Sequence, residues 1–158
     1  MAKNPNIPSL KEARIFQKER LAKGGNLLVV PFSAGKNVEA SDELDHVSLM
    51  IVKGIADTLG SAEKLFTILV EQDAQSADFI IKGRIVQMEE KSTFPKPWQK
   101  KTRQFNLAVE GSILSVDTEE ILAKFSQTKS EESQANRFEA FGYDIGVEIG
   151  RFLLLNAH

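Results

Sequence analysis

The residues whose types and spacing most suggest chemistry are Asp42 and His46, which lie four apart, with Asp45 next to His46. If this stretch is helical, a carboxylate and an imidazole share one helical face and offer two ligands to a divalent metal. Two or three ligands do not complete a site, however. An exposed acidic helix start with a His on its polar side accounts for the same residues. We therefore predict no metal site.

A second chemically interesting stretch is residues 33–37, with the sequence SAGKN, which lies where a phosphate-binding loop would connect a strand to a helix. The loop pattern requires glycine at position 30, where this chain has Val30. It also requires a magnesium-binding Ser or Thr after the lysine, where the chain has Asn37. The stretch is therefore not predicted to bind a nucleotide.

No catalytic constellation is visible in the rest of the chain. The sequence contains no cysteine, which excludes thiolate catalysis, disulfides, iron–sulfur clusters and cysteine-based zinc sites. It has only two histidines, one of them the last residue, and no nucleophile-elbow, dinucleotide or zinc-protease motif. Adjacent carboxylates such as Glu89 and Glu90 point to opposite faces of a strand. We therefore predict a protein that is not an enzyme and needs no cofactor.

The segment most indicative of binding is residues 91–103, KSTFPKPWQKKTR, which carries five positive charges and no negative one. Aromatic side chains on a proline-stiffened loop can stack on bases or fill a pocket of a partner protein, and the lysines favour phosphates or acidic surfaces. The alternative is a solvated loop whose Trp98 folds back onto the sheet. We expect an exposed Trp98, and the predicted partner-binding residues are Phe94, Lys96, Trp98, Lys100, Lys101 and Arg103.

Composition limits the classes of protein that remain. The chain has 158 residues, 42% of them hydrophobic, which is enough for one sizeable core. Its formal net charge of -2 excludes a globally basic nucleic-acid binder and an acidic disordered tail. A small nucleic-acid-binding module that uses the loop at 91–103 stays open as an alternative. The first residues lack the apolar core of a signal peptide, so a cytoplasmic chain and an exported chain with its signal removed both remain open.

Hydrophobic periodicity predicts the elements that must hold this loop. Ser9 and Glu12 form a capping-box pattern for a helix over 10–23, and the run at 27–30 predicts the central strand. The further elements are a core helix from Ser41 to Gly60, strands at 65–69, 77–88 and 104–113, a hairpin returning at 121–128, and a helix over 136–155.

Together these elements predict an α/β (α+β) domain. Its mixed, largely antiparallel sheet has four to five strands, with two main helices packed on it and an extra N-terminal helix. Residues 1–25 are expected to form a basic helical arm or tether and residues 26–158 a single domain. The last helix carries Gly142, Gly146 and Gly150 four apart, a ridge that should let a neighbouring backbone pack closely.

Three stretches resemble one group of bacterial proteins. Residues 27–32 (LLVVPF) resemble its opening strand, and residues 76–85 (SADFIIKGRI) are similar to its Ala-Asp-Tyr-Val-Val-x-Gly-x-Val strand. Residues 114–122 (LSVDTEEIL) resemble its Asp-Thr-Gly hairpin, with Glu119 in place of the usual glycine. The group is the superfamily of the TolB amino-terminal domain, the curli-secretion lipoprotein and the lipoprotein activators of penicillin-binding proteins.

This resemblance covers roughly residues 26–155 and implies a periplasmic, outer-membrane-associated protein. The implied full-length protein is lipid-anchored through a cysteine that this sequence does not contain, and it acts through protein contacts without catalysis. It implies protein partners in the cell envelope, no small-molecule substrate, and membrane attachment only through the anchor. Members of the group have different tasks, so the resemblance does not identify the partner.

Overall fold

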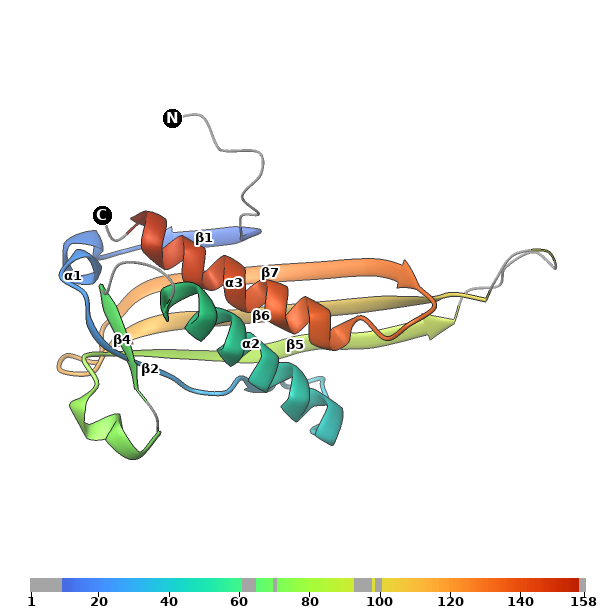
Figure 1. The fold of residues 1–158 in the computed structure, drawn as a ribbon, viewed down its shortest axis with the longest axis horizontal. Helices are drawn as coiled ribbons and strands as arrows, with labels where there is room; N and C mark the ends of the chain where they lie inside the picture. The colour runs from blue at the N-terminus through green and yellow to red at the C-terminus, as the bar shows by residue number, and fades with distance from the viewer. Residues whose placement is uncertain (1–9, 61–64, 70, 93–97, 99–100, 157–158) are drawn as a thin grey trace.

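The computed structural model describes residues 10–60, 65–69, 71–92, 98 and 101–156. These residues form one mixed β-sheet with two long helices on one of its faces (Figure 1). In chain order the elements are β1 (Glu12–Ile15), α1 (Lys18–Ala22), β2 (Gly25–Val29), β3 (Ser33–Ala34), α2 (Asp42–Gly60), β4 (Phe66–Leu69), η1 (Glu71–Ser76), β5 (Phe79–Ser92), β6 (Arg103–Ser115), β7 (Ile121–Ser133) and α3 (Phe138–Asn156).

The sheet has seven strands, not the four to five that we predicted. Six follow the order β1-β7-β6-β5-β2-β4, and β3 pairs with β5. The two additional strands, β1 and β3, have four and two residues, too short to show periodicity in the sequence. The mixed α+β class and the two main helices are confirmed.

The strands β5, β6 and β7 form a long antiparallel meander, in which β6 and β7 are the predicted hairpin. Ile81, Ile113 and Ala123 lie in register across it and are fully buried beneath the helices. Residues 117–120 connect β6 to β7, and Glu119 adopts a left-handed φ of 59°. β7 extends to Ser133, five residues beyond the predicted end at 128, because it pairs with β6 as far as Arg103.

β2 is not the central strand. It lies second from one edge, in parallel pairing with β4 on one side and β5 on the other. The meander occupies the middle of the sheet, and its longer strands carry most of the buried apolar side chains that the sheet contributes. The apolar run that we interpreted as central does bury Leu27 and Val29 beneath α2, while Leu28 points to the opposite face.

The two main helices pack on each other through glycines. The predicted ridge is confirmed: a Cβ atom on Gly146 would lie 2.1 Å from the Ile51 carbonyl oxygen, and one on Gly142 would lie 2.8 Å from the Val47 oxygen. Gly54 of α2 receives α3 equally closely. Ser41 caps α2 as predicted, because its Oγ accepts a hydrogen bond from the Leu44 amide at 3.0 Å. Neither these helices nor α1 has the length and hydrophobicity to cross a membrane.

The predicted helix over residues 10–23 is wrong. Residues 12–15 form β1, which pairs antiparallel with β7, and only Lys18–Ala22 is helical. Pairing with an open sheet edge satisfies the backbone of this segment and overrides its helical propensity. The chain leaves α1 through Gly24, whose left-handed φ of 65° favours glycine. Ser9 and the first residues lie outside the described chain, and their role as a tether stays a prediction.

Candidate binding surface

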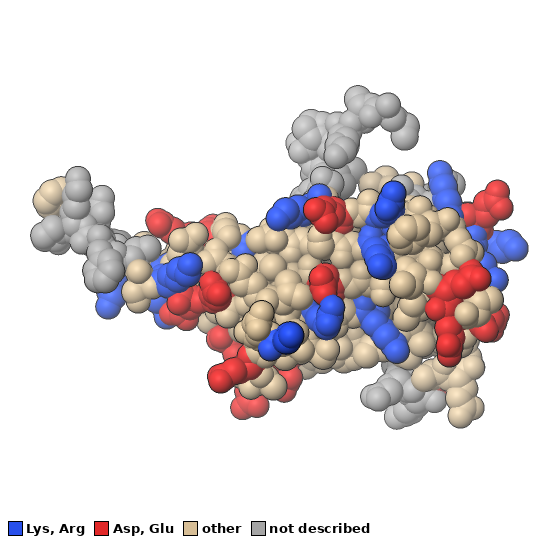
Figure 2. Space-filling view, turned by 180° about the vertical axis from the view of Figure 1, so that it is seen from behind, with Lys and Arg blue, Asp and Glu red and all other residues tan. Residues whose placement is uncertain are grey.

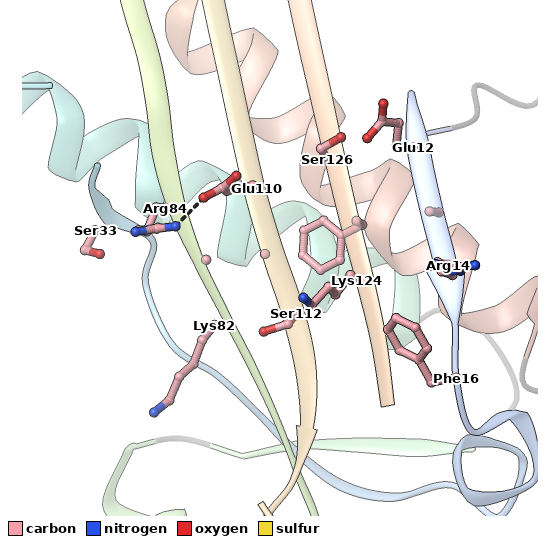
Figure 3. Close-up of a pocket in the computed structure, with 14 residues that line it drawn as sticks. Glu12, Arg14, Phe16, Ser33, Lys82, Arg84, Glu110, Ser112, Lys124 and Ser126 are labelled. Atoms are coloured by element: carbon pink, nitrogen blue, oxygen red, sulfur yellow. Dashed lines mark hydrogen bonds and ion pairs between the residues drawn. The ribbon is translucent and has the colours of Figure 1, made fainter. Parts of the chain in front are cut away.

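The face of the sheet opposite α2 and α3 has no helix over it within the described part of the chain (Figure 1). Figure 2 shows Lys and Arg side chains spread over this face, with acidic side chains between them. A shallow groove of about 930 Å³ lies here, lined by side chains from β1, β3, β5, β6 and β7 (Figure 3). We call this face of the sheet, with its groove, the uncovered face.

Three cations form a row across the uncovered face. The strand register places Arg14 opposite Lys124, Lys124 opposite Ser112, and Ser112 opposite Lys82. All four side chains therefore lie in one line perpendicular to the strands, over roughly 14 Å. We call these residues the cationic row.

The cationic row has no acidic member. Lys82 and Lys124 form no ion pair with any residue that the structure describes, and Arg14 lies over the Phe16 ring with its guanidinium carbon 5.7 Å from the ring centre. Like charges directly opposite in a sheet destabilise it. A row of this kind is therefore unfavourable for the isolated chain and favourable for an anionic partner.

The next row along the strands balances its own charge more closely. Arg84 and Glu110 form an ion pair across β5 and β6, and the row continues through Ser126 to Glu12. Figure 3 shows the Arg84 and Glu110 side chains joined in this way, while Lys82 extends freely from β5. The attraction for anions is therefore concentrated on the cationic row.

An apolar row lies on the other side of the cationic row. Leu28, Ile80, Leu114 and Ile121 occupy successive strands in register. Ile80 and Leu114 are two residues from Lys82 and Ser112, and Ile121 is three residues from Lys124 because the β6–β7 register shifts after Ile113. Phe16 follows Arg14 by two residues and is 48% exposed, and Ile121 is 39% exposed. The uncovered face thus presents the cationic row and an apolar row, which run parallel to each other.

The side chains of the cationic row are suited to contact with anions. Ser112 is the only hydroxyl of the cationic row, and neither a histidine nor a carboxylate lies beside it in that row to act as a general base. Lysine and arginine side chains at this spacing can instead hold carboxylates or other anions through charge-assisted hydrogen bonds. The sequence did not predict this surface, because its members come from four strands whose register only the fold sets.

A second cavity, of about 590 Å³, lies between α2, α3 and β7 and contains a buried charge. Glu148 of α3 is 2% exposed, and Gln127 and Lys129 of β7 hold its carboxylate through a hydrogen bond and an ion pair. At the rim, Tyr143 donates a hydrogen bond to Asp57 at 2.9 Å, which raises the pKa of the Tyr143 hydroxyl. Sequence analysis missed this cluster, although Glu148 follows Ile145 by three residues and so lies near the apolar stripe.

The predicted loop site is only partly described. Trp98 is 77% exposed, so its expected exposure is confirmed, and Lys101 is exposed as well. Arg103 is not a loop residue: it begins β6, pairs with Glu90, and lies over the Phe105 ring at 5.2 Å. Phe94, Lys96 and Lys100 lie outside the described residues. A partner-binding role for this loop stays a proposal.

The start of α2 does not assemble a metal site among the described residues. No group of three or more potential ligands lies together there. His46 is instead 3.9 Å from Glu139 of α3, and both side chains are exposed.

Comparison with known proteins identifies the fold. No family model matches the chain, and no curated protein matches its sequence. The PelC dodecamer from Paraburkholderia phytofirmans is similar in structure, with a TM-score of 0.58 at 12% identity, over 90% of this chain and 96% of that one. A dodecameric PelC variant from the same organism gives 0.61 at 14% identity, over 93% and 99%.

A third solved structure supports the same fold. XCC0632 from Xanthomonas campestris, a DUF330 protein, matches with a TM-score of 0.52 at 11% identity, over 97% of this chain and 89% of that one. At these identities the likeness is one of fold. The sequence resemblance to the TolB and curli-secretion group stays a prediction. This chain therefore has the fold of PelC and XCC0632.

Proposed function

We propose that this chain is a non-enzymatic domain of the bacterial cell envelope that acts by binding other proteins. The observation that carries the proposal is the uncovered face, where the cationic row lies beside an apolar row of partly exposed side chains. Apolar area supplies affinity for a partner, and unpaired charges supply specificity and orientation.

The size of the surface favours a macromolecular partner. Successive strands are about 4.8 Å apart, so rows that cross four or five strands extend for roughly 14 to 19 Å. Stable protein interfaces cover on the order of 800 Å² on each partner, which needs a surface of about this breadth. The groove is also wide and shallow, whereas small-molecule sites enclose most of their ligand.

The envelope location and the lipid anchor rest on the sequence resemblance to envelope lipoproteins. The fold shared with PelC agrees with that resemblance. PelC forms dodecamers, which supports contacts between copies as one form of protein binding for this chain. Fractionation of the source bacterium tests the location: the protein should be found with the envelope, and recovery in the cytosol alone would refute this part of the proposal.

Site-specific cross-linking in living cells tests the binding role. A photoreactive amino acid at Ser112 lies in the middle of the cationic row, and the same group at Asp144, which is exposed on α3, is the control. We expect discrete protein adducts from position 112 and at least severalfold fewer from position 144. Adducts with lipid or carbohydrate only, or equal labelling at the two positions, would overturn the proposal.

A further inference from the structure

We infer that the partner of the uncovered face is a second copy of this chain, which docks the first two turns of its α2 there. This inference rests on the proposed function and names its partner. The first two turns of α2 present Asp42, Asp45 and Leu49 at positions i, i+3 and i+7, which share one side of a helix. We call these three residues the α2 stripe.

The α2 stripe is exposed and directed away from the core. Leu44, Val47 and Ile51 bury the opposite side of the helix, and Leu49 is 56% exposed. Asp42 and Asp45 form no ion pair with any residue that the structure describes, and both side chains are exposed. Some acidic groups elsewhere are paired within the chain, as Asp117 is with Arg20 at 3.6 Å and Glu131 with Arg137 at 2.7 Å.

The two surfaces match in charge and in spacing. Asp45 and Leu49 are four residues apart, which corresponds to about 6 Å along a helix. The cationic row and the apolar row are two residues apart along β5 and β6, which corresponds to about 6.7 Å. A helix lying along the strands would therefore place Asp45 near Lys82 and Lys124 while Leu49 meets the apolar row. Asp42 then lies a further turn along the helix, beyond the cationic row and towards the row that begins with the Arg84–Glu110 pair, so the charge match rests on Asp45.

This contact can form only between copies. α2 packs on the face of the sheet opposite the cationic row, so the α2 stripe of one chain cannot reach its own uncovered face (Figure 1). After a single contact, the copy that has docked its α2 stripe keeps a free uncovered face, and the copy that received it keeps a free α2 stripe. The association is therefore head to tail and builds a ring or a chain of copies.

Charge reversal tests the contact. Variant F carries Lys82→Glu and Lys124→Glu on the uncovered face, and variant H carries Asp42→Lys and Asp45→Lys on the α2 stripe. Lys18→Glu with Lys36→Glu, at two other exposed lysines, is the matched control. Sedimentation velocity on the intact chain should show assemblies for wild type and control, and at least tenfold weaker association for F and for H. Circular dichroism and thermal melting verify that each variant is folded.

Mixing gives the most specific result. F has a negative α2 stripe and a negative uncovered face, and H has both surfaces positive, so only contacts between an F copy and an H copy pair opposite charges. We expect each variant alone to remain monomeric and the equimolar mixture to recover assemblies in which F and H copies alternate. F and H combined on one chain should recover association, because the reversed charges again match. Raising the salt from about 50 to 500 mM should weaken the wild-type contact.

Two outcomes overturn the inference. One is wild type that stays monomeric at all concentrations tested, and the other is F and H that assemble like wild type. If H loses stability, the neutral pair Asp42→Asn and Asp45→Asn repeats the test with less disturbance of the helix start. Protein adducts at Ser112 in cells, together with a monomeric wild type, would reject the second copy as partner and leave the proposed function standing. Absence of protein adducts would reject both.

Discussion

The two faces of the sheet differ in the side chains that alternate along the same strands: one face is apolar and buried, and the other carries charged and hydroxyl groups. On the covered face, inward residues such as Ile81 and Ile113 meet α2 and α3 and are fully buried. On the uncovered face, the residues between them, such as Lys82 and Ser112, present charge and hydroxyl groups to the solvent. Replacing a covered residue should therefore change stability, and replacing an uncovered residue should change binding.

Glycine shows how tightly the covered face is packed. Gly83 and Gly111 are paired across β5 and β6, where a Cβ atom would lie 2.5 Å from the Phe32 ring and 2.6 Å from the Phe125 ring. The two rings lie stacked, with centres 6.3 Å apart. On the uncovered face, Lys82 of β5 and Lys124 of β7 are exposed, so side-chain size is not limited in this way there.

The largest effect on stability is expected at the contact between α2 and α3. Gly146→Leu places a side chain against the Ile51 carbonyl, which would be 2.1 Å from the new Cβ, so the helices must separate. Overpacking of this kind outweighs the gain in helical propensity, and we expect a loss of about 3 kcal/mol in the free energy of unfolding. Urea denaturation followed by circular dichroism measures it.

A second glycine provides the control for this prediction. Gly60 ends α2, and a Cβ atom there would have no neighbour within 4 Å. Gly60→Ala should be neutral or gain up to about 1 kcal/mol. If Gly146→Leu were as stable as Gly60→Ala, the glycine ridge would not hold the helices together.

The next largest effect is expected at the buried carboxylate. Glu148→Ala leaves the Gln127 amide and the Lys129 ammonium without their acceptor, at a cost of about 2 kcal/mol. Asp144→Ala, at an exposed position of the same helix, should change stability by less than about 0.5 kcal/mol. Urea denaturation compares the two variants, and equal stabilities would show that the Glu148 cluster contributes nothing.

On the uncovered face we expect a small change of opposite sign. Lys124→Gln removes the like-charge contact with Arg14 and should stabilise the chain by about 0.5 kcal/mol, more at low salt than at high salt. Lys36→Gln, at an exposed lysine outside the sheet, should have no such salt-dependent effect. A loss of more than about 1 kcal/mol in Lys124→Gln would assign Lys124 to the structure and not to a binding surface.

The smallest effect on stability is expected at the loop. Trp98→Ala should change the free energy of unfolding by less than about 0.5 kcal/mol, because Trp98 is 77% exposed. As the only tryptophan it reports on this site alone: its emission should be red-shifted and readily quenched by acrylamide. If it is also a contact residue, the variant weakens partner binding by about 2 kcal/mol. Blue-shifted Trp98 emission that acrylamide quenches poorly would contradict this prediction.

The loop also keeps the nucleic-acid alternative testable. Binding of single-stranded oligonucleotides should be strongest at low salt, where counterion release is largest. Failure to bind there would remove that alternative, and a salt-dependent affinity lost in Trp98→Ala would favour it.

Sequence periodicity predicted those parts of the fold where one long segment decides its own structure. The core helix α2, the alternation of β6 and the glycine ridge of α3 were all predicted from local patterns and confirmed. Short segments failed, because their structure depends on partners distant in the sequence. Residues 12–15 become a strand only because β7 offers a free edge, and Leu27 to Val29 is displaced from the centre by the longer meander.

The candidate site could not be predicted for the same reason. Arg14, Lys82, Ser112 and Lys124 are scattered over 111 residues of sequence and become one row only through three strand registers. The loop at 91–103 could be recognised from the sequence because its positive charges lie within one short segment. Recognising it required no knowledge of the fold.

The most direct test measures stability and binding in the same variant. The double reversal Lys82→Glu and Lys124→Glu is to be combined with the photoreactive residue at Ser112, and its cross-linking yield in cells compared with its free energy of unfolding. We predict that protein adducts fall at least severalfold while stability stays within about 1 kcal/mol of wild type. Undiminished adducts, or a fall in adducts that only follows a loss of folded protein, would contradict the assignment of binding to the uncovered face.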